Sequence, residues 1–200
     1  TIMSLPDMTG IYASVWPGAA FDSIDGYIKY VNDQGGIEYT DPATGKKLHV
    51  KIRHAWEDTG GKIDQGVTIF KRLAREPKVM CVLGLNSTEA EAIKPLCEEM
   101  KIPALYTSSS LGMATPPGWI FMPDSVMYSE QAHWHLNWMK EQGLKKLGVI
   151  GWDAAYSWSK FYSYKRFAPQ YGIELIEPLE TVPFVPTDTT IQLSRLKDKG

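Results

Sequence analysis

A continuous stretch at residues 79–110 constrains the fold of this chain more than any other part of it. Residues 79–83 form a short apolar run that ends at Gly84, which is typical of a strand buried on both faces. Helix-capping residues follow at 86–88, and apolar side chains then recur at helical spacing. Residues 103–107 begin another apolar strand. The stretch therefore predicts a strand, a helix and a second strand that lies parallel to the first.

A hydroxyl-rich turn follows each of these two strands. Ser87 lies in the first turn, and Ser108 and Ser110 lie in the second. The carboxyl ends of parallel strands meet at one edge of an open sheet, where such sheets bind ligands. Ser87 also begins a predicted helix, and a helix amino terminus beside hydroxyl groups favours an anion. Capping or a polar loop explains each turn alone, but together the two turns favour a carboxylate site.

Two aromatic residues are expected at the same edge of the sheet. Trp16 follows the first predicted strand, and Tyr156 follows the strand at 145–151. Aromatic walls around a polar anchor are typical of a pocket for a small molecule. Trp16 and Tyr156 therefore join Ser87, Ser108 and Ser110 as candidate ligand-binding residues.

The whole chain alternates between strand and helix patterns, which is typical of an α/β fold with parallel sheets. Two cycles of this alternation are separated by a break at residues 122–125. We expect a first lobe at 1–121, a hinge crossover at 122–126 and the start of a second lobe at 127–200. The parallel strands expected in the first lobe are residues 1–5, 48–54, 79–83 and 103–107. The elements expected in the second lobe are helix 127–142, strand 145–151, helix 157–170, strand 173–182 and helix 188–198.

The composition limits the classes of function. The chain has 200 residues, a formal net charge of −2 and an isoelectric point near 6.1, so it offers no basic surface for nucleic acid. No apolar run approaches the roughly 18 residues that span a membrane. Residues 1–10 lack the pattern of a signal peptide. A mature chain from which a signal peptide has been removed would lack this pattern as well. Cys81 and Cys97 fit packed thiols in a strand and a helix, with a disulfide between them left open.

Motifs that would indicate a metal, a cofactor or catalysis are not found in the sequence. His133 and His135 lie two residues apart in a predicted helix, so they point to opposite sides rather than to one metal ion. No glycine-rich phosphate motif follows a strand, and no G-x-S-x-G motif is present. The serines at 108–110 have no histidine or acid close in sequence. We therefore expect neither a cofactor nor a metal, and a protein that is not an enzyme.

Several short motifs occur in the order in which they occur in a known family. They are PDMTG at 6–10, the predicted helix at 20–31 with Asn32 and the glycine cap Gly35-Gly36 that ends it, Asp58-Thr59, Val82-Leu83-Gly84 with Ser87, Ile102-Pro103 with residues 108–110, and Asp153 with Tyr156. With these motifs the chain resembles the type 1 periplasmic binding proteins, and specifically the branched-chain amino-acid binding proteins of bacterial ABC importers. Each motif is weak alone, but the set covers the whole chain in order and is specific together.

The resemblance implies a two-lobed, hinged binding protein that closes on a small ligand and delivers it to a membrane permease. In such families, the turns holding Ser87 and holding Ser108 and Ser110 bind the ligand carboxylate. The position of Trp16, where tyrosine is more usual, gives an aromatic wall, and Tyr156 closes from the second lobe. The acidic residue that recognises an ammonium group would lie beyond position 200. The ligand therefore stays open between an amino acid, with branched-chain ones foremost, an aromatic acid and an amide.

The resemblance also implies a periplasmic or extracellular location after removal of a signal peptide, with a lipid anchor in the full-length protein left open. Two other functions stay open beside transport. One is the ligand-sensing domain of a receptor or regulator on the same fold, and the other is a Rossmann-like enzyme that acts on a carboxylate. Only two clear strands are expected in the second lobe, which leaves an unpaired sheet edge. We therefore expect a piece of a longer chain whose second lobe is incomplete.

Overall fold

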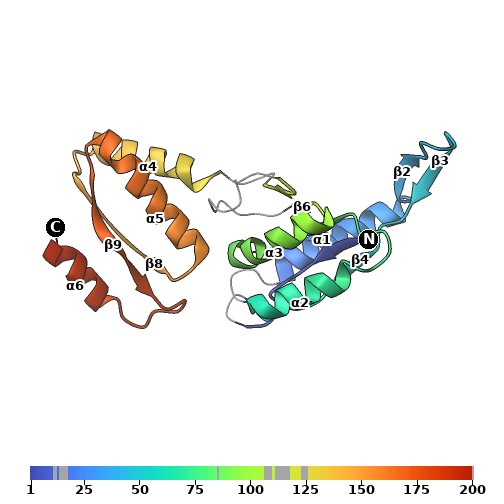
Figure 1. Ribbon diagram of the computed structural model, residues 1–200, viewed down its shortest axis with the longest axis horizontal. Coiled ribbons are helices and arrows are strands. Elements are labelled where there is room, and N and C mark those ends of the chain that lie inside the picture. Colours follow the sequence, from blue (N-terminus) through green and yellow to red (C-terminus); the bar gives the residue numbers. More distant parts are fainter. Residues whose placement is uncertain are drawn as a thin grey trace. The chain divides into compact units, whose positions relative to one another are not determined.

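The chain forms two compact units that both combine helices with parallel strands (Figure 1). The first unit comprises residues 1–107 with 117–123, and the second comprises residues 108–116 with 124–200. The predicted α/β fold with parallel sheets is confirmed, while the lobe boundaries stay predictions because the expected crossover is only partly described. The computed structural model describes residues 1–10, 13, 18–84, 86–105, 110, 118–122 and 126–199.

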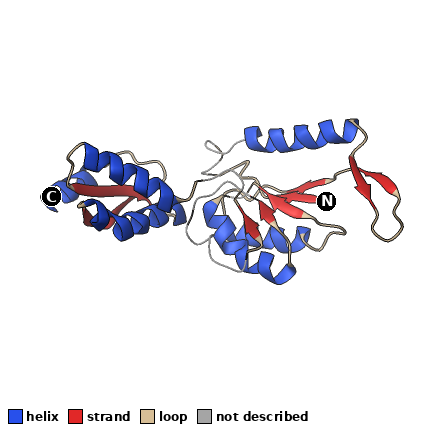
Figure 2. Cartoon of the chain, turned by 90° about the horizontal axis from the view of Figure 1, so that it is seen from above, coloured by secondary structure: helices blue, strands red, loops and turns tan. Residues whose placement is uncertain are grey.

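The first unit is built on a five-stranded sheet in the order β4-β1-β5-β6-β7, in which every neighbouring pair is parallel. Figure 2 shows α1 over one face of this sheet and α2 and α3 over the other. Because both faces are covered, Met3 of β1 and Val82 of β5 have no exposed surface. The strands are β1 (Ile2–Ser4), β4 (His54–Trp56), β5 (Cys81–Leu83), β6 (Ala104–Leu105) and β7 (Ile120–Phe121), and the helices are α1 (Gly18–Asp33), α2 (Ile63–Leu73) and α3 (Ser87–Met100).

Helix α3 begins and packs as its sequence predicts. The side chain of Asn86 caps it by accepting hydrogen bonds from the backbone N–H groups of the second and third helical residues. Ile93 and Cys97 on its inner face have no exposed surface. Cys97 and Cys81 are free thiols, and burial raises the pKa of Cys97 to about 12. The interpretation of Cys97 as a packed thiol is therefore confirmed.

The prediction of one strand at 48–54 is wrong. Residues 47–50 instead form β3 (Lys47–Val50), which pairs antiparallel with β2 (Ile37–Thr40) in a separate hairpin. Every residue of both strands is exposed. The strand that joins the parallel sheet comes after this hairpin, at residues 54–56. The apolar alternation in this region therefore reflects cross-strand pairs on one face of a hairpin rather than a face buried in the core.

The hairpin is attached to α1 by close backbone contacts. The side chain of Asn32 accepts a hydrogen bond from the N–H of Ile52 and donates one to its carbonyl, both at 2.8 Å. Gly35 and Gly36 end α1 with positive φ angles of 101° and 92°, as the sequence predicts. A Cβ atom on Gly36 would lie 2.5 Å from the carbonyl oxygen of Val50, whereas a Cβ on Gly35 would meet nothing within 4 Å.

The second unit has a two-stranded parallel sheet and a helical layer. Helices α4 and α5 pack against each other, and Leu136 of α4 and Ala168 have no exposed surface in the core that they share. No helix among the described residues is long and apolar enough to cross a membrane. The elements are α4 (Tyr128–Glu141), β8 (Lys146–Trp152), α5 (Ala155–Phe167), the 3-10 helix η2 (Ala168–Tyr171), β9 (Glu174–Val182) and α6 (Thr190–Lys199).

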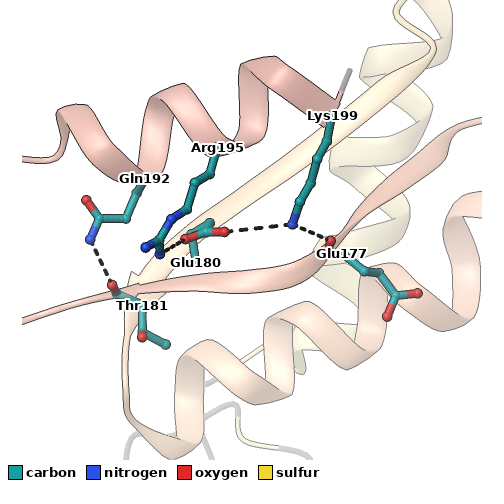
Figure 3. A network of polar contacts seen from close by, with 6 residues as sticks. All are labelled: Glu177, Glu180, Thr181, Gln192, Arg195 and Lys199. Atoms are coloured by element: carbon teal, nitrogen blue, oxygen red, sulfur yellow. Dashed lines mark hydrogen bonds and ion pairs between the residues drawn. The ribbon is translucent and has the colours of Figure 1, made fainter.

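Polar contacts hold α6 along β9, as Figure 3 shows. The carboxylate of Glu180, which is only 6% exposed, lies 3.4 Å from Nη1 of Arg195 and 4.0 Å from Nζ of Lys199. Gln192 donates to the carbonyl of Thr181 at 3.3 Å. None of the residues of α6 is buried. Glu180 thus has the cationic partners that a buried acid needs, and these contacts contribute to the attachment of α6.

Replacement of the two glycines at the end of α1 tests how the hairpin is attached. We expect Gly35→Ala to lower the free energy of unfolding by about 1–2 kcal/mol, the cost of a positive φ in a residue with a Cβ. Gly36→Ala should cost more, because its Cβ also displaces the backbone at Val50. Urea denaturation of both variants measures the difference. Equal losses would show that the close backbone approach is not a constraint.

Candidate functional site

A buried carboxylate joins three loops at the carboxyl edge of the first sheet. Asp7, which follows β1, is 4% exposed. Its Oδ1 accepts hydrogen bonds from the hydroxyl of Thr59 and, at 3.2 Å, from the N–H of Gly61, both in the loop after β4. Its Oδ2 accepts a hydrogen bond at 2.8 Å from Nδ2 of Asn86, in the turn after β5. Asp7 therefore fixes these three loops relative to one another.

Asp58 organises the same edge from the loop after β4. Its Oδ1 accepts hydrogen bonds from the N–H groups of Met8 at 2.9 Å, Thr9 at 3.2 Å and Gly60 at 2.9 Å, and its Oδ2 accepts one from the Thr9 hydroxyl at 2.5 Å. Burial opposes ionisation of Asp58, but these hydrogen bonds outweigh it and lower its pKa. Asp58 is therefore a charged residue that joins two loops, and both of its carboxylate oxygens already accept hydrogen bonds.

Ser87 lies at this edge as the first residue of α3. Oδ1 of Asn86 accepts the N–H groups of Thr88 and Glu89 at 3.0 Å each, so two donors of the helix amino terminus are already used by the cap. An anion at this end would therefore depend on the Ser87 hydroxyl and on the helix dipole rather than on an open row of amides. The structure thus places Ser87 on a turn whose position is set by Asn86 and Asp7.

Tyr156 lies in the second unit, in the first turn of α5, within a group of aromatic side chains. Its ring centroid is 5.3 Å from that of Trp152 and 6.4 Å from that of Tyr128. Phe184 lies 4.1 Å from Trp152. Trp152 ends β8 and Phe184 follows β9, so this group gathers at the carboxyl ends of both strands. Sequence reasoning found only Tyr156, although the placement of Trp152 and Phe184 after strands was the same signal.

Ser110 also belongs to the second unit, where it has no exposed surface. Its hydroxyl lies 3.1 Å from the hydroxyl of Ser159 in α5. The structure thus assigns Ser87 to one unit and Ser110 and Tyr156 to the other. Trp16 and Ser108 lie outside the described residues. The convergence of these five residues on one ligand stays a prediction.

A second polar constellation has the distances of a nucleophile, a base and an orienting acid. The hydroxyl of Ser4 lies 2.7 Å from Nε2 of His54, and Nδ1 of His54 lies 3.2 Å from Asp25. Ser4 is on β1, however, and only 2% of it is exposed, so no substrate can reach its hydroxyl. The ring of Phe21 stacks on His54 at 5.3 Å. These contacts fasten α1 to the sheet and do not form a catalytic site.

The part of the chain that the structure describes has no cluster of three or more histidine, cysteine or acidic residues able to hold a metal ion. His133 and His135 instead bind tyrosine hydroxyls. Nδ1 of His133 lies 2.8 Å from the hydroxyl of Tyr171, and Nδ1 of His135 lies 2.5 Å from that of Tyr164. Both histidines thus join α4 to the helical segments that follow β8.

Helix-covered parallel strands occur in both units, with polar turns at the carboxyl ends of the strands in the first and aromatic side chains at those ends in the second. Such sheet edges are where α/β proteins bind ligands. The family model described as Periplasmic binding protein matches residues 1–200. The chain therefore belongs to the periplasmic binding protein family. No curated protein sequence matches it.

Several solved structures share the fold. A branched-chain amino acid ABC transporter protein from Thermus thermophilus with bound valine is 20% identical, with a TM-score of 0.80, over 100% of this chain and 50% of that one. A fatty acid ABC transporter substrate-binding protein from Thermomonospora curvata is 21% identical, with a TM-score of 0.78, over 98% and 48%. A solute-binding protein from Rhodopseudomonas palustris BisB5, in complex with 3,4-dihydroxybenzoic acid, is 23% identical, with a TM-score of 0.70, over 98% and 50%. The chain thus spans about half the length of these proteins.

The contact between Asn86 and Asp7 leads to a prediction that is unusual for a helix cap. Asparagine and aspartate cap helices about equally well, but Asn86→Asp would place a carboxylate against Oδ2 of Asp7. We expect a loss of about 1–3 kcal/mol in the free energy of unfolding at pH 7. The like charges raise the pKa of the new pair in the folded state, so part of this loss should return as the pH falls towards 5. Urea denaturation at both pH values measures it.

Asn86→Ala is the matched control, because it removes both the cap and the contact without adding a charge. It should cost at least the roughly 0.5–2 kcal/mol of a lost cap, and its recovery towards pH 5 should be smaller than that of Asn86→Asp, because Asp7 loses a donor but meets no like charge. Wild-type stability of Asn86→Asp at pH 7 would show that Asp7 does not depend on the Asn86 amide.

Proposed function

We propose that this chain is part of the solute-binding protein of an ABC importer and that it captures a small carboxylate ligand. The observation that carries the proposal is the placement of Ser87 at the amino terminus of α3 and at the carboxyl end of β5, on a turn fixed by Asn86 and Asp7. A helix amino terminus with a hydroxyl group is a favourable environment for a carboxylate. The ligand would be held between two lobes and passed to a membrane permease, outside the cytoplasm.

The similar structures support a carboxylate more than they support any one compound. One has bound valine, one belongs to a fatty acid transporter, and others are in complex with 4-hydroxybenzoate and 3,4-dihydroxybenzoic acid. The two hydroxybenzoates share an aromatic ring, but the carboxyl group is the one feature that valine, fatty acids and hydroxybenzoates have in common. We infer that the carboxylate anchor is the shared part of recognition, while the rest of the pocket selects an amino acid, an aromatic acid or another chain.

The second unit offers chemistry suited to the variable part of such a ligand. Trp152, Tyr156, Tyr128 and Phe184 gather at the carboxyl ends of its strands. Such faces suit an aromatic or aliphatic group better than a second charge. Aromatic acids and apolar amino acids are therefore the first compounds to test. A sensor domain on the same fold would bind the same compounds, and a transmembrane or DNA-binding domain in the full protein would favour that alternative.

A ligand screen followed by calorimetry tests the proposal. Native mass spectrometry of the purified chain, followed by a thermal-shift screen of valine, leucine, 4-hydroxybenzoate, 3,4-dihydroxybenzoate and octanoate, should identify a carboxylate that raises the melting temperature. Ser87→Ala should then lower the affinity for the best compound by about 10- to 100-fold, since hydrogen bonds to charged groups contribute about 1.5–3 kcal/mol.

Two comparisons make this result specific. Thr68→Ala is the matched control, because Thr68 is exposed on α2 and its hydroxyl donates to the carbonyl of Asp64 within the same helix. The corresponding amide or alcohol of the best compound should bind to the wild type at least as weakly as the acid binds to Ser87→Ala, because it also loses the attraction of the helix dipole. An unchanged affinity of Ser87→Ala for the acid would contradict the carboxylate anchor, and turnover of the compound would favour an enzyme.

A further inference from the structure

A buried carboxyl group beside the candidate site has no role in the contacts described so far. Glu89 lies in the first turn of α3, three residues after the cap Asn86, and is 1% exposed. No hydrogen bond of ordinary geometry from the described residues reaches either of its carboxyl oxygens, although the side chains of Asp7 and Thr59 lie close enough to influence its ionisation. An ionised carboxylate in such a place would carry a large desolvation cost. The group is therefore expected to be neutral.

The surroundings of Glu89 contain acids and uncharged groups. A Cβ atom on Gly66 of α2 would lie 3.4 Å from its carboxyl group, so the absence of a side chain there leaves room for it. The charged groups that act on Glu89 are Asp7, in the loop after β1, and Asp58, in the loop after β4. Burial first, and then the charge of Asp7, raise the pKa of Glu89 to about 8, although the nearby Thr59 hydroxyl opposes the rise.

We propose that the proton on Glu89 is a lock that keeps Asp7 in contact with Asn86 and so holds the turn that carries Ser87 in place. When Glu89 loses this proton, a second negative charge appears inside the helix and loop packing beside Asp7. We expect α3 and the loop after β1 to separate in response, which would break the 2.8 Å contact between Asp7 and Asn86. The inference rests on the proposed function for its consequence, which is that ligand release is coupled to alkaline pH.

The direction of the effect on stability follows from linkage. A carboxyl group whose pKa rises from 4.5 to about 8 on folding holds its proton longer in the folded state. Its stabilising contribution is complete below pH 4.5, is lost as the pH rises to about 8, and does not change above that. The folding equilibrium constant should fall by up to about tenfold for each pH unit in this window.

Glu89→Gln mimics the protonated group and should remove this dependence. Glu99→Gln, on the exposed side of the same helix, removes one acid without changing the surroundings of Glu89 and Asp7. It should keep the pH dependence of stability of the wild type. Amide hydrogen exchange on the whole 200-residue chain provides the direct readout at Thr88 and Glu89, whose N–H groups are bound by the Asn86 cap. Their protection factors, corrected for intrinsic exchange, should fall between pH 6.5 and 9.5 in wild type and in Glu99→Gln, and stay constant in Glu89→Gln.

A carbon-13 NMR titration of the wild type keeps the inference falsifiable if Glu89→Gln does not fold. The Glu89 carboxyl should titrate near pH 8, and a midpoint near 4.5 would overturn the proposal. Protection factors that fall equally in Glu89→Gln and wild type would also overturn it.

Calorimetry separates this inference from the proposed function. With 4-hydroxybenzoate or valine as the probe, whichever binds, wild-type affinity should fall at least threefold from pH 6.5 to 9.5, while Glu89→Gln shows no such fall. A pH-independent wild-type affinity, beside pH-dependent protection, would overturn the coupling to ligand and leave the carboxylate-binding function intact. Failure of every carboxylate to bind would contradict the proposed function, while the exchange and NMR results would still decide whether the lock exists.

Discussion

The carboxylate of Asp7 is the interaction on which the edge of the first unit depends. Parallel strands bring the loops after β1, β4 and β5 to one side of the sheet, but the strand ladder itself does not fix the shape of those loops. Asp7 supplies buried acceptors to Thr59, Gly61 and Asn86, which lie in two other loops. A buried carboxylate is tolerated only where its oxygens have donors, so the loops and the acid stabilise one another.

Asn86 connects Asp7 to the candidate site. Its amide nitrogen donates to Asp7, while its amide oxygen caps α3. One side chain thus couples the position of the helix to that of the loop after β1, and Ser87 follows it directly. The polar groups that hold the turn are therefore distinct from the hydroxyl that would contact a ligand. Substitutions in this network should act on Ser87 by moving it rather than by removing a contact.

Local sequence patterns predicted the elements correctly where local interactions determine the structure. The apolar run before Gly84, the capping residues and the helical spacing predicted β5 and α3, and the glycines at 35–36 predicted the end of α1. The apolar alternation around Leu48 and Val50 gave the wrong prediction of one strand at 48–54, because an exposed hairpin and a half-buried strand share the same period of two. Asp7 was missed for a different reason: its partner Asn86 lies 79 residues away in sequence, and no spacing rule connects them.

The charges at the edge of the sheet limit what the candidate site can bind. Asp7 contacts the cap residue Asn86, and Asp58 acts electrostatically on Glu89 in the first turn of α3, so each would repel a carboxylate at this end of the helix. The helix dipole attracts it with the equivalent of roughly half a charge, and this attraction is weakened by every ionised acid close to it. A third ionised acid at Glu89 would leave the helix end with little net attraction for an anion. A neutral Glu89 would therefore serve both the packing of α3 and the electrostatic environment of the carboxylate proposed at Ser87, and one proton would couple the two.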